Sequence, residues 1–155
     1  MWFTRQINER LQSVTGREFS TISDLEKFGE KSKACAIHSH LEVLGVRDLN
    51  ADNGARLIGQ AWMIADLIKA IPSISTSSKR SEIPLELINK YNIDINLISQ
   101  KAQPKELENA VYDMASIGFI RLCGVTEIYI PNSPKHAFPA FLYAVSPHIH
   151  TILSL

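Results

Sequence analysis

A single acidic side chain, Asp66, stands in an otherwise apolar stretch of the sequence, residues 59–75. Carboxylate oxygens are ligands that Mg²⁺ prefers in proteins, and a magnesium site that binds a phosphate group usually takes one or two carboxylates in near-octahedral geometry. Asp66 is therefore a candidate remnant of a metal site. The alternative is a polar residue that faces a cleft or solvent and pairs with Lys69 at i+3, a contact worth roughly a few tenths of a kcal/mol.

Two histidine pairs, His38 with His40 and His148 with His150, suggest zinc as a second candidate metal. Residues two apart on a helix point to well-separated faces, so this spacing makes a poor chelate. We therefore expect no metal site at either pair.

Asp113 is expected to be a solvated or ion-paired surface residue.

No serine, cysteine or lysine stands in a recognisable nucleophile setting, so no catalytic residue is assigned. Cys35 and Cys123 have no C-x-x-C spacing, and we expect both to be buried free thiols in a reducing compartment.

The composition indicates one globular domain with a single core. The chain has 155 residues, of which 45% are hydrophobic, and its 16 basic and 16 acidic residues give a formal net charge of zero. This balance gives no global electrostatic reason to expect binding to nucleic acid or to an anionic membrane. The sequence begins without a signal-peptide pattern and has no uninterrupted apolar run of about 18 residues, so we expect an intracellular protein.

Apolar residues recur at helical spacing along most of the chain, and no segment alternates as a strand would. The sequence therefore predicts an all-α fold. The expected helices cover residues 2–14, 23–45, 55–71, 84–91 and 104–130, with a polar connector at 46–54 and shorter helical pieces near 95–100, 139–145 and 147–155.

Several local signals define the ends of these helices. Ser23 with Glu26 is a candidate capping box, and Gly45 is a plausible residue just beyond the helix end. Gly29 should weaken its helix by about 1 kcal/mol relative to alanine. Pro72 should end the third helix, because proline lacks the amide donor and clashes with the preceding turn.

Two of the expected helices have faces that can be assigned to the core. The third helix is apolar nearly all round, which indicates burial between other helices. The longest expected helix, 104–130, should bury one stripe, formed by Leu107, Val111, Met114 or Ala115, Phe119, Leu122 and Val125.

Five stretches of the sequence resemble the squalene/phytoene synthase family, in particular its branch of mitochondrial complex I assembly factors and their bacterial relatives. The order and spacing of these stretches carry the resemblance over nearly the whole chain. They are "LEVLGVRD" (41–48), Gly59 with Ala61, "SSKRSEIPLEL" (77–87), "VYDMAS" (111–116) and "AFPAFL" (137–142).

The resemblance implies a partial isoprenoid (terpenoid) synthase-like helical bundle. Residues 1–155 would form a single domain truncated at its N-terminal side, where the family carries its first aspartate-rich motif. The family's other motif has the form Q-x-x-N-x-x-x-D-x-x-x-D, and its positions correspond here to Met63, Asp66, Ala70 and Ile74. Alanine and isoleucine supply no side-chain oxygen, so the resemblance predicts no magnesium–diphosphate site, no catalytic residue and no cofactor.

Lys79 and Arg80 lie in the stretch that resembles the family's R-x-R diphosphate contact. By this likeness they would touch a phosphate or a lipid head group. The alternative is a solvated basic loop beside Glu82, the usual state of surface charge.

The resemblance predicts a non-catalytic assembly or scaffold factor for respiratory complex I. It would act through a protein partner or self-association of exposed apolar helices, with peripheral membrane contact and no nucleic acid, in the bacterial cytoplasm or mitochondrial matrix. The alternative is half of a split head-to-head prenyltransferase that uses Mg²⁺ and prenyl diphosphates with a second chain. A third alternative is a decayed reading frame without a function.

Overall fold

All the regular secondary structure in the described part of the chain is helical, which confirms the all-α prediction. The computed structural model describes residues 4, 7, 18–71, 83–94 and 105–142. No strand occurs within these residues. The helices are α2 (Ile22–Ser32), α3 (Ala34–Val43), α4 (Leu49–Ala70), α5 (Leu85–Tyr91), α7 (Lys105–Gly124), the π-helix η2 (Val125–Tyr129) and the 3₁₀ turn η3 (Lys135–Ala137), which continues as helix at 138–142.

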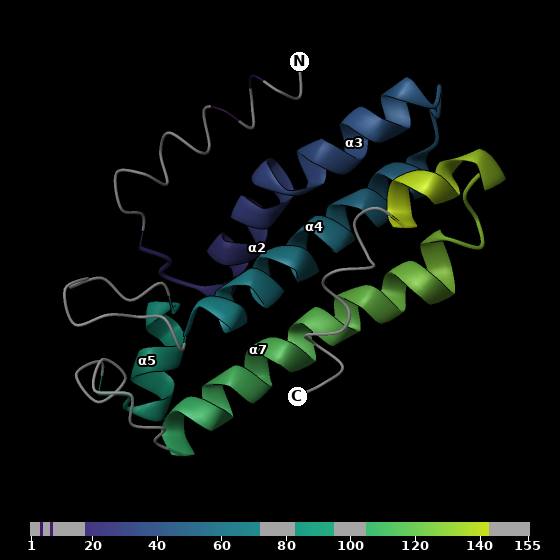
Figure 1. The fold of residues 1–155 in the computed structure, drawn as a ribbon. Coiled ribbons are helices and arrows are strands. Elements are labelled where there is room, and N and C mark those ends of the chain that lie inside the picture. The colour runs from purple at the N-terminus through teal and green to yellow at the C-terminus, as the bar shows by residue number, and fades with distance from the viewer. Residues whose placement is uncertain (1–3, 5–6, 8–17, 72–82, 95–104, 143–155) are drawn as a thin grey trace.

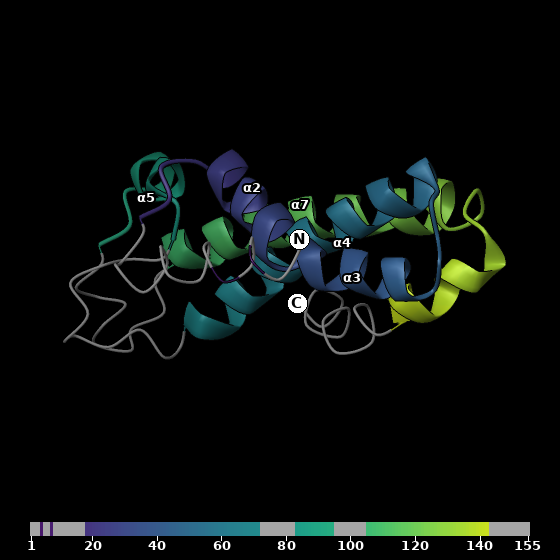
Figure 2. The ribbon, with the colours of Figure 1, turned by 90° about the horizontal axis from the view of Figure 1, so that it is seen from above.

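Helix α4 is the central element of the fold. It packs against α2 and α3 on one side and against α7 on the other, while α5 packs against α7 (Figure 1). Seen from above, α2 and α5 lie toward one end of the bundle and the 138–142 helix lies with α3 at the other (Figure 2). The predicted burial of α4 between other helices is confirmed, because most of its residues from Ala51 to Ile68 are buried.

Most buried apolar side chains of the described residues form two clusters, one toward each end of the bundle, and a small third cluster contains Ala61, Ala65 and Leu122. The larger includes Leu25, Phe28, Ile64, Leu67, Ile83, Leu87 and Met114, and therefore joins α2, α4, α5 and α7. The second includes Ile37, Leu41, Ala51, Ile58, Val125 and Phe141, and joins α3, α4, η2 and the 138–142 helix. Removing such surface from water, at about 25 cal/mol per Å², is the main force that assembles the helices.

The predicted helix 23–45 is two helices, α2 and α3, divided at Lys33. Thr21 is the N-cap of α2, and its hydroxyl accepts a hydrogen bond from the Asp24 amide at 3.1 Å. Ser23 lies inside α2, so the capping-box prediction was wrong by two residues. Gly45, with φ of +71°, follows α3 in the left-handed region that glycine tolerates, as predicted.

Glycine at position 29 permits the close approach of α2 and α4. A Cβ on Gly29 would lie 2.6 Å from the carbonyl oxygen of Gly59, and a Cβ on Gly59 would lie 2.7 Å from Ala34. Neither distance is compatible with an alanine unless the backbone moves. The residue that weakens α2 as an isolated helix is thus required by the packing of α2 on α4.

Helix α4 begins at Leu49, six residues before its predicted start at Ala55. Asp48 has an extended backbone, and its carboxylate accepts a hydrogen bond from the Ala51 amide at 2.9 Å. This is a standard N-cap, which satisfies one of the amides that a helix start leaves unpaired. The polar residues that follow Asp48 were interpreted as a connector, but they form the first turns of the helix.

The buried stripe of α7 is confirmed except at its centre. Leu107, Met114, Ala115, Leu122 and Val125 are buried and Val111 is partly buried, but Phe119 is 46% exposed. Ala110 and Gly118 are buried instead. Both are small residues, whereas the prediction favoured large apolar ones and therefore chose Phe119 over its neighbour Gly118.

The short helix α5 matches its predicted position. Pro84, the first residue of the predicted helix, is its N-cap, and Asn92 is its C-cap, in a left-handed conformation with φ of 49°. The amide of Leu85 donates to the carbonyl of Phe19 at 2.9 Å, which joins α5 to the segment before α2.

Several predicted elements fall outside the described residues. These are the helix at 2–14 apart from residues 4 and 7, the helix-ending Pro72, the element near 95–100, the end of the piece at 139–145 and the helix at 147–155. Among the helices that are described, none combines the length and the apolar composition needed to cross a bilayer.

Candidate functional site

Asp66 forms an ion pair with Lys33, a residue from the junction between α2 and α3. The Lys33 Nζ lies 2.5 Å from the Asp66 Oδ2, and the two side chains are only 21% and 32% exposed. The same ammonium lies 5.2 Å from the centre of the Trp62 ring, one turn earlier on α4. Lys33 is therefore held by a carboxylate and an aromatic face on one side of α4.

The side chains beside Asp66 do not fit a magnesium ion. Met63 offers a thioether and Ala70 a methyl group, whereas Mg²⁺ requires oxygen ligands. The Asp66 carboxylate already contacts the ammonium of Lys33. Ile74, the last position of the motif, lies outside the described residues. Across the described ranges, no three His, Cys, Asp or Glu side chains are grouped closely enough to hold a metal.

The contact with Lys33 was not foreseen from the sequence. The predicted partner of Asp66 was Lys69, which lies three residues later on the same helix. Lys33 is 33 residues away along the chain and reaches Asp66 only because α2 and α3 pack on α4. A tertiary contact of this kind leaves no local signal.

A second polar group lies in the interface between α2 and α4, around Gln60. Its Nε2 lies 3.4 Å from Glu30, whose carboxylate is 4.0 Å from Arg56. The Gln60 Oε1 is buried without a hydrogen-bond partner among the described residues. The sequence did not predict this polar group, although Gln60 stands out as an uncharged polar residue within an apolar helix.

Asp113 is ion-paired at the contact between α5 and α7, in agreement with the surface role expected for it. Its Oδ2 accepts hydrogen bonds from Lys90 Nζ and Tyr91 Oη, each at 2.6 Å. The hydrogen bond from Lys90, followed by that from Tyr91, lowers the pKa of Asp113. In turn, the hydrogen bond to Asp113 raises the pKa of Lys90.

Arg121 and Glu26 form a further ion pair, between α7 and α2, at 2.8 Å. The hydrogen bond to Glu26 raises the pKa of Arg121. Because α2 and α7 each pack on α4, this pair links the two helices on either side of the central one. Its geometry indicates a structural role.

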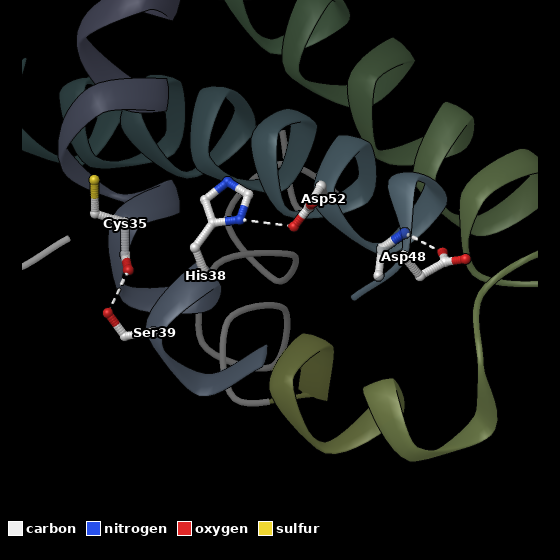
Figure 3. Close-up of polar contacts among 6 residues, drawn as sticks. Cys35, His38, Ser39, Asp48 and Asp52 are labelled. Carbon is white, nitrogen blue, oxygen red and sulfur yellow. Dashed lines mark hydrogen bonds and ion pairs between the residues drawn. The ribbon is translucent and has the colours of Figure 1, made fainter. Parts of the chain in front are cut away.

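His38 and Asp52 meet at the corner where α3 leads into α4 (Figure 3). The His38 Nδ1 lies 3.2 Å from the Asp52 Oδ1, and the imidazole is 12% exposed. His40, two residues along α3, instead contacts the carbonyl of Ala36 with its Nδ1 at 2.8 Å. The two histidines thus have separate partners, as expected for residues at i and i+2. A groove of about 540 Å³ lies beside His38 and Asp52.

The remaining candidate residues lie outside the described part of the chain. Lys79 and Arg80, the candidate contacts for a diphosphate or a lipid head group, fall within 72–82. His148 and His150 fall within 143–155. Of the two cysteines, Cys35 is buried as expected, whereas Cys123 is only partly buried, and both are free thiols.

Comparison with known proteins identifies the chain's relatives. The model of the squalene/phytoene synthase family matches residues 1–155. A Mus musculus protein named NADH dehydrogenase (ubiquinone) complex I, assembly factor 6 is 31% identical over 145 residues, which cover 94% of this chain and 43% of that protein. Its Homo sapiens counterpart is 28% identical over the same shares. The Drosophila melanogaster homolog is 36% identical over 140 residues, or 86% of this chain and 41% of that protein.

The chain spans less than half the length of these relatives. No solved structure matches it.

Proposed function

The chain belongs to the squalene/phytoene synthase family, and we propose that it is a non-catalytic member that acts in the assembly of respiratory complex I. The similar mouse, human and fruit fly proteins are all named as assembly factors of complex I. Under this proposal, the helical bundle serves as a scaffold that contacts other proteins.

The observation that carries the proposal is the pairing of Asp66 with Lys33. An enzyme that binds Mg²⁺ and a diphosphate at this face of α4 would need at least one carboxylate free to bind the metal. Here the Asp66 carboxylate contacts an internal ammonium at 2.5 Å, and Ala70 supplies no oxygen. Replacing the ammonium with a metal would leave Lys33 partly buried and without its counter-charge, which is energetically costly.

We propose that the chain contacts a protein partner or a second copy of itself through the outer face of α7. Tyr112, Phe119 and Ile120 are 72%, 46% and 62% exposed on this helix, and Ile128 on η2 is 55% exposed. Large apolar residues grouped on one face of a soluble protein are typical of interaction surfaces.

For the location, we propose the side of the membrane on which complex I is assembled, the mitochondrial matrix or the bacterial cytoplasm. Peripheral contact with the inner membrane through Lys79 and Arg80 is part of the same proposal, because a basic pair suits anionic lipid head groups. Vesicle flotation with the Lys79→Gln, Arg80→Gln variant tests this point. Unchanged binding would remove these residues from the proposal.

The function is tested by complementation in cells that lack the protein. The chain should restore assembled complex I on native gels, and so should a variant in which both charges are replaced, Lys33→Met with Asp66→Leu, because no carboxylate chemistry is required. In parallel, the purified chain should release no pyrophosphate from a prenyl diphosphate with Mg²⁺. Pyrophosphate release that requires a second chain with an intact aspartate-rich motif would instead support a split prenyltransferase.

A further inference from the structure

The corner between α3 and α4 carries a groove that has no part in the Asp66 site. It has a volume of about 540 Å³, and the residues that line it include His38, Glu42, Gly45, Arg47, Leu49 and Asp52. A volume of this size lies within the range of known ligand sites, roughly 300–1,000 Å³. The groove is open to solvent on one side, so a segment from another protein has access to it.

The charge of the groove is locally acidic. Three carboxylates, Glu42, Asp48 and Asp52, line it against one guanidinium, that of Arg47. Asp48 caps α4 and Asp52 contacts His38, but the structure records no partner for the Glu42 carboxylate among the residues that it describes. Because the whole chain has a formal net charge of zero, this acidity belongs to the corner and not to the protein as a whole.

Two exposed apolar side chains lie at the same corner. Val43, the last residue of α3, is 88% exposed, and Leu49, the first residue of α4, is 75% exposed. Leu49 lines the groove itself. Apolar contact area combined with charged residues at the rim is the composition of a protein-binding surface.

We propose that the α3–α4 corner binds a basic amphipathic segment of a partner protein. Apolar side chains of that segment pack on Val43 and Leu49, while its lysine or arginine side chains pair with Glu42 and Asp52. The acidic lining favours this partner over a nucleic acid or an anionic membrane, both of which present negative charge. The proposal rests on the proposed scaffold function, to which it adds a docking surface and the chemistry of the partner.

A pair of synthetic peptides tests the proposal on the full chain. The probe is a helical peptide with leucines at i, i+3 and i+7 flanked by lysines, and its control has every lysine replaced by glutamate. Amide shifts of the ¹⁵N-labelled chain should move at Gly45, Val46 and Leu49 with the lysine peptide. The lysine peptide should bind at least about fivefold more tightly than the glutamate peptide, given typical energies of exposed ion pairs.

Two variants separate the charges from the apolar contact. Glu42→Gln with Asp52→Asn should weaken the lysine peptide by roughly fivefold, and Leu49→Ser should weaken both peptides. The control variant, Glu106→Gln with Glu108→Gln, also removes two negative charges, but from the first turn of α7. It should change the affinity of neither the lysine peptide nor the glutamate peptide. Thermal unfolding of each variant confirms that the fold is intact.

Equal binding of the two peptides, shifts confined to another surface, or no binding at all would each overturn the proposal. None of these results would affect the scaffold assignment. That assignment depends on the absence of pyrophosphate release and on restoration of assembled complex I.

Discussion

The ammonium of Lys33 lies 2.5 Å from the carboxylate of Asp66 and also faces the ring of Trp62. Three described residues of α4, Met63, Asp66 and Ala70, occupy positions of the family's second acidic motif. Of these three, only Asp66 carries side-chain oxygens. Its negative charge is balanced within the protein. The pair joins the α2–α3 junction to the central helix.

Breaking this pair should destabilise the protein. Lys33→Met leaves the Asp66 carboxylate partly buried without its partner, and we expect a loss of about 1–2 kcal/mol, between the values for exposed and buried pairs. Replacing both residues, Lys33→Met with Asp66→Leu, should recover most of the loss. Urea unfolding of the single and double variants measures the coupling.

Lys27→Met is the matched control, since its partner Asp24 lies at 3.6 Å and both side chains are exposed. We expect a change below about 0.5 kcal/mol. A coupling energy between Lys33 and Asp66 near zero would show that the contact does not hold the carboxylate.

Gly29→Ala should lower stability by about 1–3 kcal/mol, the usual cost of overpacking a close contact. The new methyl group would lie 2.6 Å from the backbone oxygen of Gly59, so the helices must separate. Gly124→Ala is the control: its methyl group would lie 3.6 Å from Leu57, an ordinary contact, in a helical backbone. That variant should be neutral or slightly stabilising, and equal losses at both positions would contradict the packing account.

Stability should depend on pH through Asp113. Its pKa in the folded protein is lowered, mainly by Lys90, from an ordinary value of 3.8. The stabilisation is therefore fully present above about pH 4 to 5 and is lost as the pH falls through the lowered value. Denaturant unfolding between pH 2 and pH 6 should show a smaller dependence on pH for Asp113→Asn than for the unmodified chain. Parallel curves for the two proteins would rule out the effect.

The exposed face of α7 should promote association. Phe119→Ser with Ile120→Ser removes apolar surface without touching the buried stripe, so we expect a lower apparent mass in light scattering at high protein concentration and little change in unfolding. Val43→Ser, at the far corner of the bundle, is the comparison and should leave the mass unchanged. A stable monomer for the unmodified chain would exclude self-association through α7.

The fold was largely predictable because long helices with a periodic apolar face leave a strong signal. The central position of α4 followed from its apolar character, and the buried stripe of α7 was largely correct. The helix ends were less accurate, because Thr21 and Asp48 act as caps within polar stretches that also suit loops. Phe119 was misplaced because some of the buried positions of α7 hold small residues, Ala110 and Gly118, which carry little hydrophobic signal.

The candidate site was only partly predictable. That the positions beside Asp66 lack oxygen ligands is visible in the sequence at Met63 and Ala70. The partner of Asp66 was not visible, because Lys33 reaches it through the packing of helices distant in the sequence. The groove beside His38 and Asp52 likewise depends on how α3 turns into α4.

The most direct test of the central claim is thermal unfolding of the full chain with and without MgCl₂ and a prenyl diphosphate. A ligand at 100 times its Kd stabilises a protein by about 2.7 kcal/mol. At roughly 2–4 °C per kcal/mol for a chain of this size, binding would raise Tm by several degrees. We predict no shift beyond about 1 °C. A rise of several degrees that needs both components and disappears in Asp66→Asn would contradict the account.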